Sequence, residues 1–268
     1  MKSIQIVVPA LLACLLAACG GGEDNIISTA GGTTSTTTGD SALVTGSVSA
    51  PFVAGVSPRY FLFGVGSQRF GRLSTSKQAA NGAMTTINDS VLSGATVVNE
   101  VSGDAAFAQG RWAGGLASTS SGAATLTGNA AYHYITYNAL NAVFPASGAL
   151  VCDAGMFTAP TYIGGGTGTF ATSGTATGQA AVTFSSAGAF VTGAVTGAAN
   201  GATSAITLNT TLADPSGTGS TGNLFGSSAG AVVAMGDAGG GNYLVLAAYA
   251  LGYPSGARYQ GVATFHCR

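Results

Sequence analysis

The sequence predicts an all-β fold: an antiparallel meander that closes into a small up-and-down barrel of about eight strands, preceded by extra N-terminal strands. Three observations support this prediction. Short runs rich in Val, Ile, Thr, Phe and Tyr alternate with Gly, Ser and Asn breaks. Several runs place apolar residues at every second position, the period of a strand with one buried face. Glycine supplies 43 of 268 residues and no long 3.6-residue period appears, which disfavours helices.

The chain starts with an export signal of ordinary anatomy. Met1-Lys2 gives a positive start, and an apolar stretch follows from Ile4 to Ala18. A transmembrane helix needs about 20 apolar residues, so this stretch is too short to be one. We therefore expect residues 1–18 to be removed on export.

The end of that stretch, Leu16-Ala17-Ala18-Cys19, resembles the lipobox of bacterial lipoproteins. The resemblance implies cleavage before Cys19 and lipid attachment to its side chain. Gly20 follows in place of an aspartate, which by resemblance to Gram-negative lipoproteins favours the outer membrane, at its periplasmic face or on the cell surface. Cys14, which follows Leu-Leu-Ala, is a second candidate lipid site, and a plain secretory signal is the other alternative.

Residues 19–40 are rich in Gly, Ser and Thr and include the run Thr33–Thr38, which predicts a flexible tether. An all-β domain is expected over 41–268, with its barrel starting at about residue 168. The segment Gln68–Asn88 is less regular and predicts a loop or a partial hairpin. The expected strands are Ala42–Val48, Tyr60–Val65, Ala95–Val101, Ala105–Trp112, Ala123–Tyr137, Thr175–Phe184, Ala189–Thr196, Ser204–Leu212, Ala229–Met235, Asn242–Ala250 and Ala257–His266.

The second half carries a family resemblance. A strand ends in Ala181-Val182-Thr183-Phe184, and the runs Phe190–Gly197, Ala205–Leu212 and Asn223–Gly226 follow it. This order resembles the small β-barrels of transferrin-binding protein B and related surface lipoproteins, over roughly Gly168–Arg268. The closing glycine–aromatic–glycine–proline strand of that family is absent from Tyr243–Phe265. The resemblance therefore implies the barrel and the surface lipoprotein class, without transferrin binding.

Charge excludes one class of function. Charged residues are 6% of the chain and the formal net charge is −1, which leaves no electrostatic basis for nucleic-acid binding. The cations gather in the first half of the chain. They are either solvated charges on strand faces or a basic patch for an acidic partner or lipid headgroups. The residues concerned are Arg59, Arg69, Arg72, Lys77 and Arg111.

Two cysteines remain once the signal is removed and Cys19 carries lipid, namely Cys152 and Cys267. Export places them in an oxidising compartment, so we expect one disulfide between them. Free thiols or a metal site are the alternatives. His266 stands beside Cys267, yet no second Cys-His pair completes a metal motif. The acidic residues are scattered, so neither a metal nor a cofactor is predicted.

A short motif offers an enzymatic alternative. Gly226–Gly230 matches the G-x-S-x-G elbow of serine hydrolases, with Ser228 as nucleophile and Asp237 and His266 as later partners. The elbow requires a helix after the serine, whereas residues 231–235 predict a strand. Glycine and serine are also abundant enough for a chance match.

The densest aromatic cluster is Tyr132-His133-Tyr134 with Tyr137. Strand alternation places Tyr132 and Tyr134 on one face and His133 on the other. The cluster either packs as part of a barrel wall or forms a ligand surface, for which haem is one candidate because Tyr and His ligate iron. Arg111 and the only tryptophan, Trp112, are similar candidates.

Together these patterns predict a lipid-anchored protein of the outer membrane that acts as a non-enzymatic binding or adhesion module. Its expected partners are the membrane, through the lipid, and a host or envelope protein; the patterns do not specify a small ligand. A structural envelope lipoprotein without a soluble ligand is the main alternative. A haem or iron-acquisition lipoprotein and a Ser228-dependent esterase are the further alternatives.

Overall fold

Nineteen strands in three sheets account for the regular structure in this computed structural model, which describes residues 43–64, 66–224 and 229–268. All the described residues belong to one compact unit, Gly39–Arg268. The described part of the chain is free of helices, which confirms the predicted all-β class, and so it holds no helix long and apolar enough to cross a membrane. The predicted signal (1–18), the tether (19–40), Cys19 and Ser228 lie outside the described residues.

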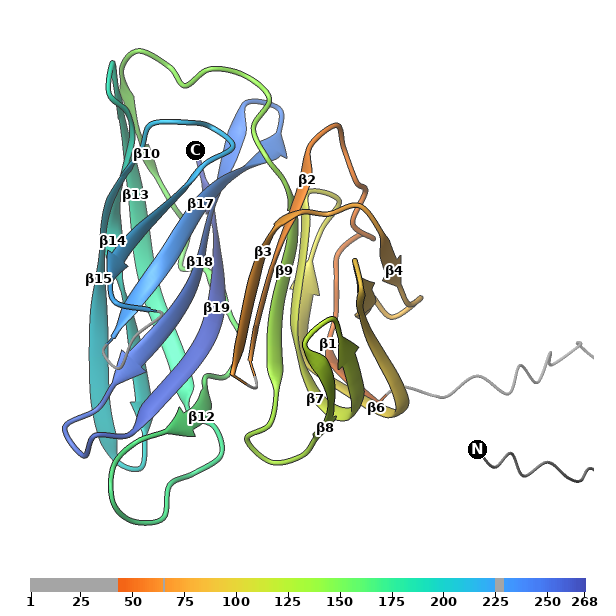
Figure 1. The fold of residues 1–268 in the computed structure, drawn as a ribbon. Helices are drawn as coiled ribbons and strands as arrows, with labels where there is room; N and C mark the ends of the chain where they lie inside the picture. The colour runs from red at the N-terminus through yellow and green to blue at the C-terminus, as the bar shows by residue number, and fades with distance from the viewer. Residues whose placement is uncertain (1–42, 65, 225–228) are drawn as a thin grey trace, which may run out of the picture. The chain divides into compact units, whose positions relative to one another are not determined.

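The first half of the described chain folds into one sheet, the N-terminal sheet, whose main path runs β3-β2-β9-β7-β6-β5-β4. β8 pairs with β7, and β1 adds to β6 in parallel, while the other pairs are antiparallel. Figure 1 shows how strongly this sheet curls. Its strands are β1 (Leu43–Gly46), β2 (Pro58–Gly64), β3 (Ser67–Arg72), β4 (Ser76–Gln78), β5 (Met84–Ile87), β6 (Ser90–Gly103), β7 (Phe107–Thr119), β8 (Gly122–Leu126) and β9 (Tyr132–Asn138).

The second half forms two sheets that face each other. The outer sheet runs β10-β13-β14-β15, and the middle sheet runs β11-β19-β18-β17-β16 with β12 also paired to β19. The outer strands are β10 (Gly148–Val151), β13 (Thr175–Ser185), β14 (Gly188–Ala199) and β15 (Ala202–Leu212). The middle strands are β11 (Met156–Phe157), β12 (Thr161–Gly164), β16 (Thr218–Gly222), β17 (Gly230–Gly239), β18 (Asn242–Gly252) and β19 (Arg258–Cys267).

These two sheets make the barrel-like half of the molecule that the meander predicts. Its interior is filled by side chains. Phe184, Val195 and Leu208 of the outer sheet pack against Tyr249 and Phe265 of the middle sheet in one buried cluster. The barrel-like half also begins earlier than residue 168, because β10, β11 and β12 pair with its strands.

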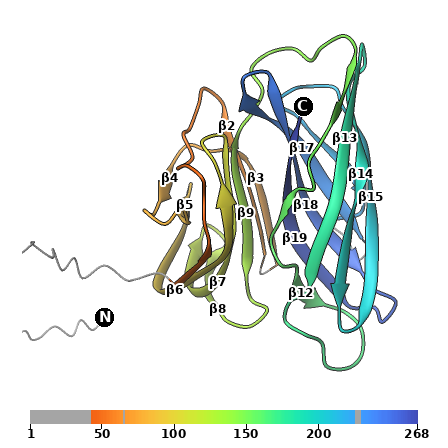
Figure 2. The same cartoon turned by 180° about the vertical axis from the view of Figure 1, so that it is seen from behind.

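The middle sheet is covered on both faces. Its second face packs on the N-terminal sheet, where Phe61, Phe107 and Ile135 meet Leu246 and Val262. Figure 2 shows β17, β18 and β19 between the N-terminal sheet and β13, β14 and β15. Double burial explains why β18 is an almost unbroken apolar run, whereas β13, with one face exposed, alternates.

Two glycines inside strands make room for tyrosines on the neighbouring strand. Tyr134 lies opposite Gly110, and Tyr249 lies opposite Gly261. A Cβ added at either glycine would approach the tyrosine hydroxyl to 2.5 Å. Each tyrosine ring therefore packs over the backbone of its glycine, in space that a side chain at the glycine position would fill. Such packing of an aromatic ring on glycine is a known way to stabilise glycine within a sheet.

Each predicted strand is recovered, one of them as two strands. The structure also contains short strands that were not predicted, namely β3, β4, β5, β10, β11, β12 and β16. The predicted run Ala123–Tyr137 is two strands, β8 and β9, because a turn bonded from Ala130 N–H to Thr127 O separates them and Gly128 takes a positive φ of 59°. The irregular segment Gln68–Asn88 holds β3, β4 and β5. Its strands are short, so no extended alternation marks them in the sequence.

Candidate functional site

The predicted aromatic cluster is part of the protein interior. Trp112 packs against Tyr132 and Tyr134, with ring centroids 6.2 and 6.1 Å apart, inside the curl of the N-terminal sheet. Met84 holds two of these side chains: its carbonyl accepts from Trp112 Nε1 at 2.7 Å, and its N–H donates to Tyr134 Oη at 3.1 Å. These contacts make a core, and no ligand-contacting surface forms here.

His133 faces the other way, as the alternation predicts. It is fully buried, with Nδ1 at 2.7 Å from Thr158 Oγ1 and Nε2 at 3.0 Å from Thr161 Oγ1. Burial, with the Arg111 charge second, holds the pKa of His133 well below 6.5. Tyr137 is also buried, and burial raises its pKa to about 12. With both ring nitrogens engaged and the tyrosines enclosed, this cluster offers no ligand to haem iron.

The buried neutral histidine predicts acid sensitivity. The unfolded chain takes up a proton at this residue below about pH 6.5, whereas the folded protein does not. The free energy of unfolding is thus expected to fall as the pH drops below 6.5, by up to about 1.4 kcal/mol per pH unit from this group. Urea unfolding of the wild type and of His133→Gln between pH 7 and pH 5 measures the effect.

His133→Gln keeps an amide that can bond both threonines and has no charge to gain, so its unfolding energy should fall less over this range. His266→Gln, in a half-exposed position, is the matched control and should retain the His133 slope. Identical pH dependence in the wild type and His133→Gln would contradict the assignment.

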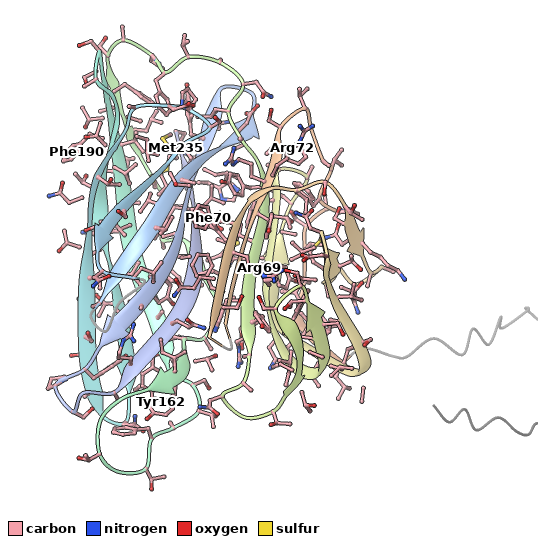
Figure 3. The ribbon with its side chains drawn as sticks, viewed as in Figure 1. Arg69, Phe70, Arg72, Tyr162, Phe190 and Met235 are labelled. Carbon is pink, nitrogen blue, oxygen red and sulfur yellow. A yellow bond between two sulfur atoms is a disulfide. The ribbon has the colours of Figure 1, made fainter. Side chains whose placement is uncertain are left out.

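Two of the five first-half cations are paired with carboxylates. Arg111 is 7% exposed and donates to both oxygens of Glu100, at 2.8 Å from Nε and 2.7 Å from Nη2. Arg69, labelled with Arg72 on β3 in Figure 3, donates to both oxygens of Asp89 at 3.0 and 3.1 Å. Two of the five residues of the expected basic patch are therefore neutralised by carboxylates, and Arg111 is excluded from the expected ligand surface.

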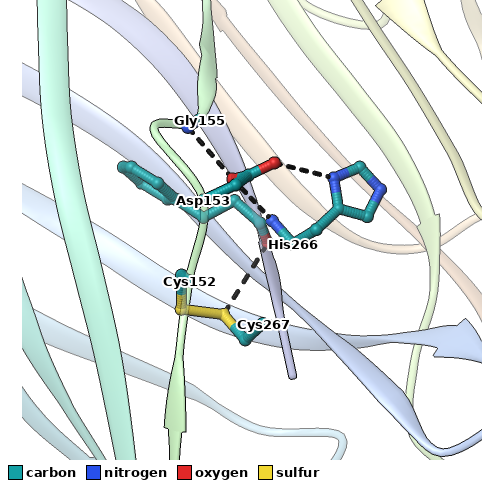
Figure 4. The surroundings of a disulfide bond; sticks show 6 residues. Cys152, Asp153, Gly155, His266 and Cys267 are labelled. Carbon is teal, nitrogen blue, oxygen red and sulfur yellow. Dashed lines mark hydrogen bonds and ion pairs between the residues drawn. A yellow bond between two sulfur atoms is a disulfide. The ribbon is translucent and has the colours of Figure 1, made fainter.

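The predicted disulfide between Cys152 and Cys267 is present and joins the start of the barrel-like half to the end of β19. Figure 4 shows a polar cluster beside it. Asp153 Oδ1 accepts from the backbone N–H groups of Gly155 and His266, each at 3.0 Å. The His266 ring lies between two carboxylates, with Nδ1 at 3.4 Å from Asp153 Oδ2 and Nε2 at 3.0 Å from Asp104 Oδ2.

This cluster works as a brace between sheets. Asp104 comes from the β6–β7 turn of the N-terminal sheet, so its contact with His266 fixes the last strand to that sheet.

A hollow of about 560 Å³ lies beside this polar cluster, lined in part by Asn242 and Arg268. Among the described residues, no group of three His, Cys, Asp or Glu side chains could hold a metal ion.

The residues predicted as hydrolase partners are not brought together as an acid–histidine pair. Asp237 accepts from the Gly239 N–H at 2.8 Å, while His266 is held by Asp104 and Asp153. A hydrolase triad needs its acid to orient the histidine, and Asp237 does not do so here. Ser228 lies outside the described residues.

A cleft that the motifs did not indicate lies where the N-terminal sheet meets the middle sheet. It measures about 520 Å³ and is lined by the β2–β3 hairpin, β12, β19 and Leu224. A smaller hollow of about 260 Å³ shares Gly66 and Ile163 with it. The polar residues that line the larger, 520 Å³ cleft are Ser67, Gln68, Arg258 and Gln260. Arg258 Nε is buried and lacks a hydrogen-bond partner among the described residues.

The polar residues of β19 form a row on one face of a buried strand. Gln260 lines the cleft, Thr264 donates to Gln109 Oε1 at 2.7 Å, and His266 bonds Asp104. Between them, Val262 packs in the apolar contact of the two sheets. Polar residues that share one face of an otherwise apolar strand, interrupted there by Val262 alone, are the sequence signal that would have marked this face, because buried polar groups need partners.

Comparison of the chain with protein-family models, with curated proteins and with solved structures gave no match. The functional argument therefore rests on the chemistry of this chain. That chemistry comprises a disulfide, a braced three-sheet domain and a cleft in which Arg258 Nε has no hydrogen-bond partner among the described residues.

Proposed function

We propose that this protein is a lipid-anchored lipoprotein of the bacterial outer membrane whose β domain is a non-enzymatic binding module. The observation that carries the proposal is the motif Leu16–Cys19, with its apolar lead and the polar tract that follows it. The Cys152–Cys267 disulfide supports export, since such bonds persist in oxidising compartments. The disulfide also accounts for two of the four cysteines, leaving Cys14 and Cys19 as the candidates for lipid.

Binding is favoured over catalysis by the groups that line the cleft. Guanidinium, amide and hydroxyl groups hold and orient a ligand, whereas general acid–base or nucleophilic chemistry needs a titrating or activated group. Among the described lining residues of the cleft, none is His, Asp, Glu, Cys or Lys. The second candidate, a structural envelope lipoprotein, is favoured by the filled interior of the barrel-like half.

Cys19→Ser tests the anchor. Wild-type protein expressed in a Gram-negative host is expected in the membrane fraction, to incorporate labelled palmitate, and to need detergent for release. Cys19→Ser should carry no label, because the residue to which the lipid is attached is absent. Without acyl chains to insert in the bilayer, the variant should appear in the soluble periplasmic fraction. Protease digestion of whole cells then distinguishes the cell surface, where the domain is cut, from the periplasmic face.

Cys14→Ser is the matched control, since it removes the other candidate cysteine of the signal, and it should keep both the label and the membrane location. A Cys19→Ser variant that stays membrane-bound and labelled would overturn the proposed anchor. Loss of these properties in Cys14→Ser alone would assign the lipid to Cys14 instead.

A further inference from the structure

Arg258 occupies an unusual electrostatic position. It begins β19, lines the 520 Å³ cleft, and has its Nε buried without a hydrogen-bond partner among the described residues. The ion pairs of the described residues involve Arg69, Arg111 and His266, so Arg258 is not joined to a carboxylate there. A buried guanidinium N–H without an acceptor destabilises a protein. A bound ligand that accepts this hydrogen bond is the simplest explanation for the unpaired N–H of Arg258.

The groups around Arg258 add donors without adding negative charge. Gln260 is 5% exposed and lines the cleft, as does Gln68 of β3. Gln68 Nε2 donates to Leu224 O at 3.5 Å, which orients that amide beside the cleft. Ser67 supplies a hydroxyl. The described lining thus holds one positive charge, two amides and no acidic side chain.

We propose that this cleft binds the carboxylate of a small hydroxylated molecule, of the class of acidic sugars. The guanidinium fork matches a carboxylate with two parallel hydrogen bonds, and side-chain amides pair with neighbouring hydroxyl groups. A single arginine balances a monoanion, whereas a phosphate dianion would leave charge uncompensated. The cleft volume lies within the range of roughly 300–1,000 Å³ that small-molecule sites occupy.

The site is assembled from segments far apart in the chain. The β2–β3 hairpin supplies Ser67 and Gln68, while β19 supplies Arg258 and Gln260. Figure 1 shows the lower end of β2 and β3 beside β12, which pairs with β19. Small-molecule sites are concave and hold a few precisely placed polar groups, as this cleft does. This inference deepens the proposed binding function and rests on it.

The side-chain N–H of Arg258 is itself the reporter. In a ¹H–¹⁵N spectrum of the Cys19→Ser protein purified from the soluble periplasmic fraction, D-glucuronate is expected to shift the Arg258 Nε–H signal saturably, with an affinity of about millimolar. The signal is assigned by its absence in Arg258→Gln. D-glucose, which lacks the carboxylate, should leave it in place, and inorganic phosphate should bind more weakly than glucuronate.

Two variants make the test specific. Arg258→Lys keeps the charge and loses the fork, so glucuronate binding, read from the backbone amides of Gln68 and Gln260, should weaken by about tenfold or more. Arg72→Lys, on β3 but outside the cleft lining, is the matched control and should bind like the wild type. Unfolding curves confirm that each variant is folded.

Several results would overturn the cleft assignment: no shift of the Arg258 signal with glucuronate, an equal shift with glucose, or unchanged affinity in Arg258→Lys. None of these bears on lipid attachment, so failure of the cleft site and failure of the membrane anchor are distinguishable.

Discussion

Removal of the Cys152–Cys267 disulfide is expected to lower the free energy of unfolding by about 4–5 kcal/mol. The bond closes a loop with a sequence separation of 115 residues, and a longer closed loop restricts the unfolded chain more. It also fastens the end of β19, a strand with sheets packed on both faces. Guanidinium unfolding of the oxidised wild type and of Cys152→Ala/Cys267→Ala measures the difference.

The reduced wild type is the control, because it loses the bond and keeps both side chains. It should unfold at nearly the same denaturant concentration as the double variant. The backbone bonds between Val151 and Arg268, at 3.2 and 3.1 Å, hold the same two segments together without the disulfide. A loss below about 1 kcal/mol would mean that these bonds alone fix the C-terminus and would contradict the expected role of the disulfide.

Glu100→Gln is expected to lower the free energy of unfolding by about 2–3 kcal/mol. It leaves the Arg111 guanidinium buried without a compensating charge, and loss of one partner of a buried pair costs about 3–5 kcal/mol in fully enclosed sites. The value is reduced here because the Glu100 side chain is 28% exposed. Urea unfolding at pH 7 measures the effect.

Two further variants isolate the charge effect. Glu100→Gln combined with Arg111→Met should recover most of the loss, because no unpaired charge then remains buried. Asp89→Asn breaks the Arg69–Asp89 pair, whose carboxylate is 49% exposed, and should cost less than about 1 kcal/mol. Equal losses in Glu100→Gln and Asp89→Asn would show that burial of Arg111 does not set the cost.

Local sequence predicts much of the fold. The strand expected at Thr175–Phe184 is β13, Thr175–Ser185, because its alternating Val182 and Phe184 face the core while Thr177 and Thr183 face solvent. The disulfide was predicted from the number of cysteines together with the expected export of the chain. Short strands such as β4 and β5 were missed, since three or four residues are too few to display a period.

The candidate site was harder to predict, because alternation separates the two faces of a strand without telling what covers each. In β9, Tyr134 packs inside the N-terminal sheet, while His133 on the opposite face meets Thr158 and Thr161 from the segment around β12. Both faces are therefore buried, and the aromatic cluster is core. Conversely, Arg258 and Gln260 were passed over because the cleft exists only once the β2–β3 hairpin packs beside β19.

Peptide mapping by mass spectrometry of the protein isolated from the cell envelope tests both the proposed lipid attachment to Cys19 and the disulfide in one experiment. The predicted result is a chain that begins at a lipid-modified Cys19, with the peptides of Cys152 and Cys267 linked until a reductant is added. A chain that still begins at Met1, an unmodified Cys19, or Cys152 and Cys267 that alkylate without reduction would contradict a lipid-anchored, exported domain.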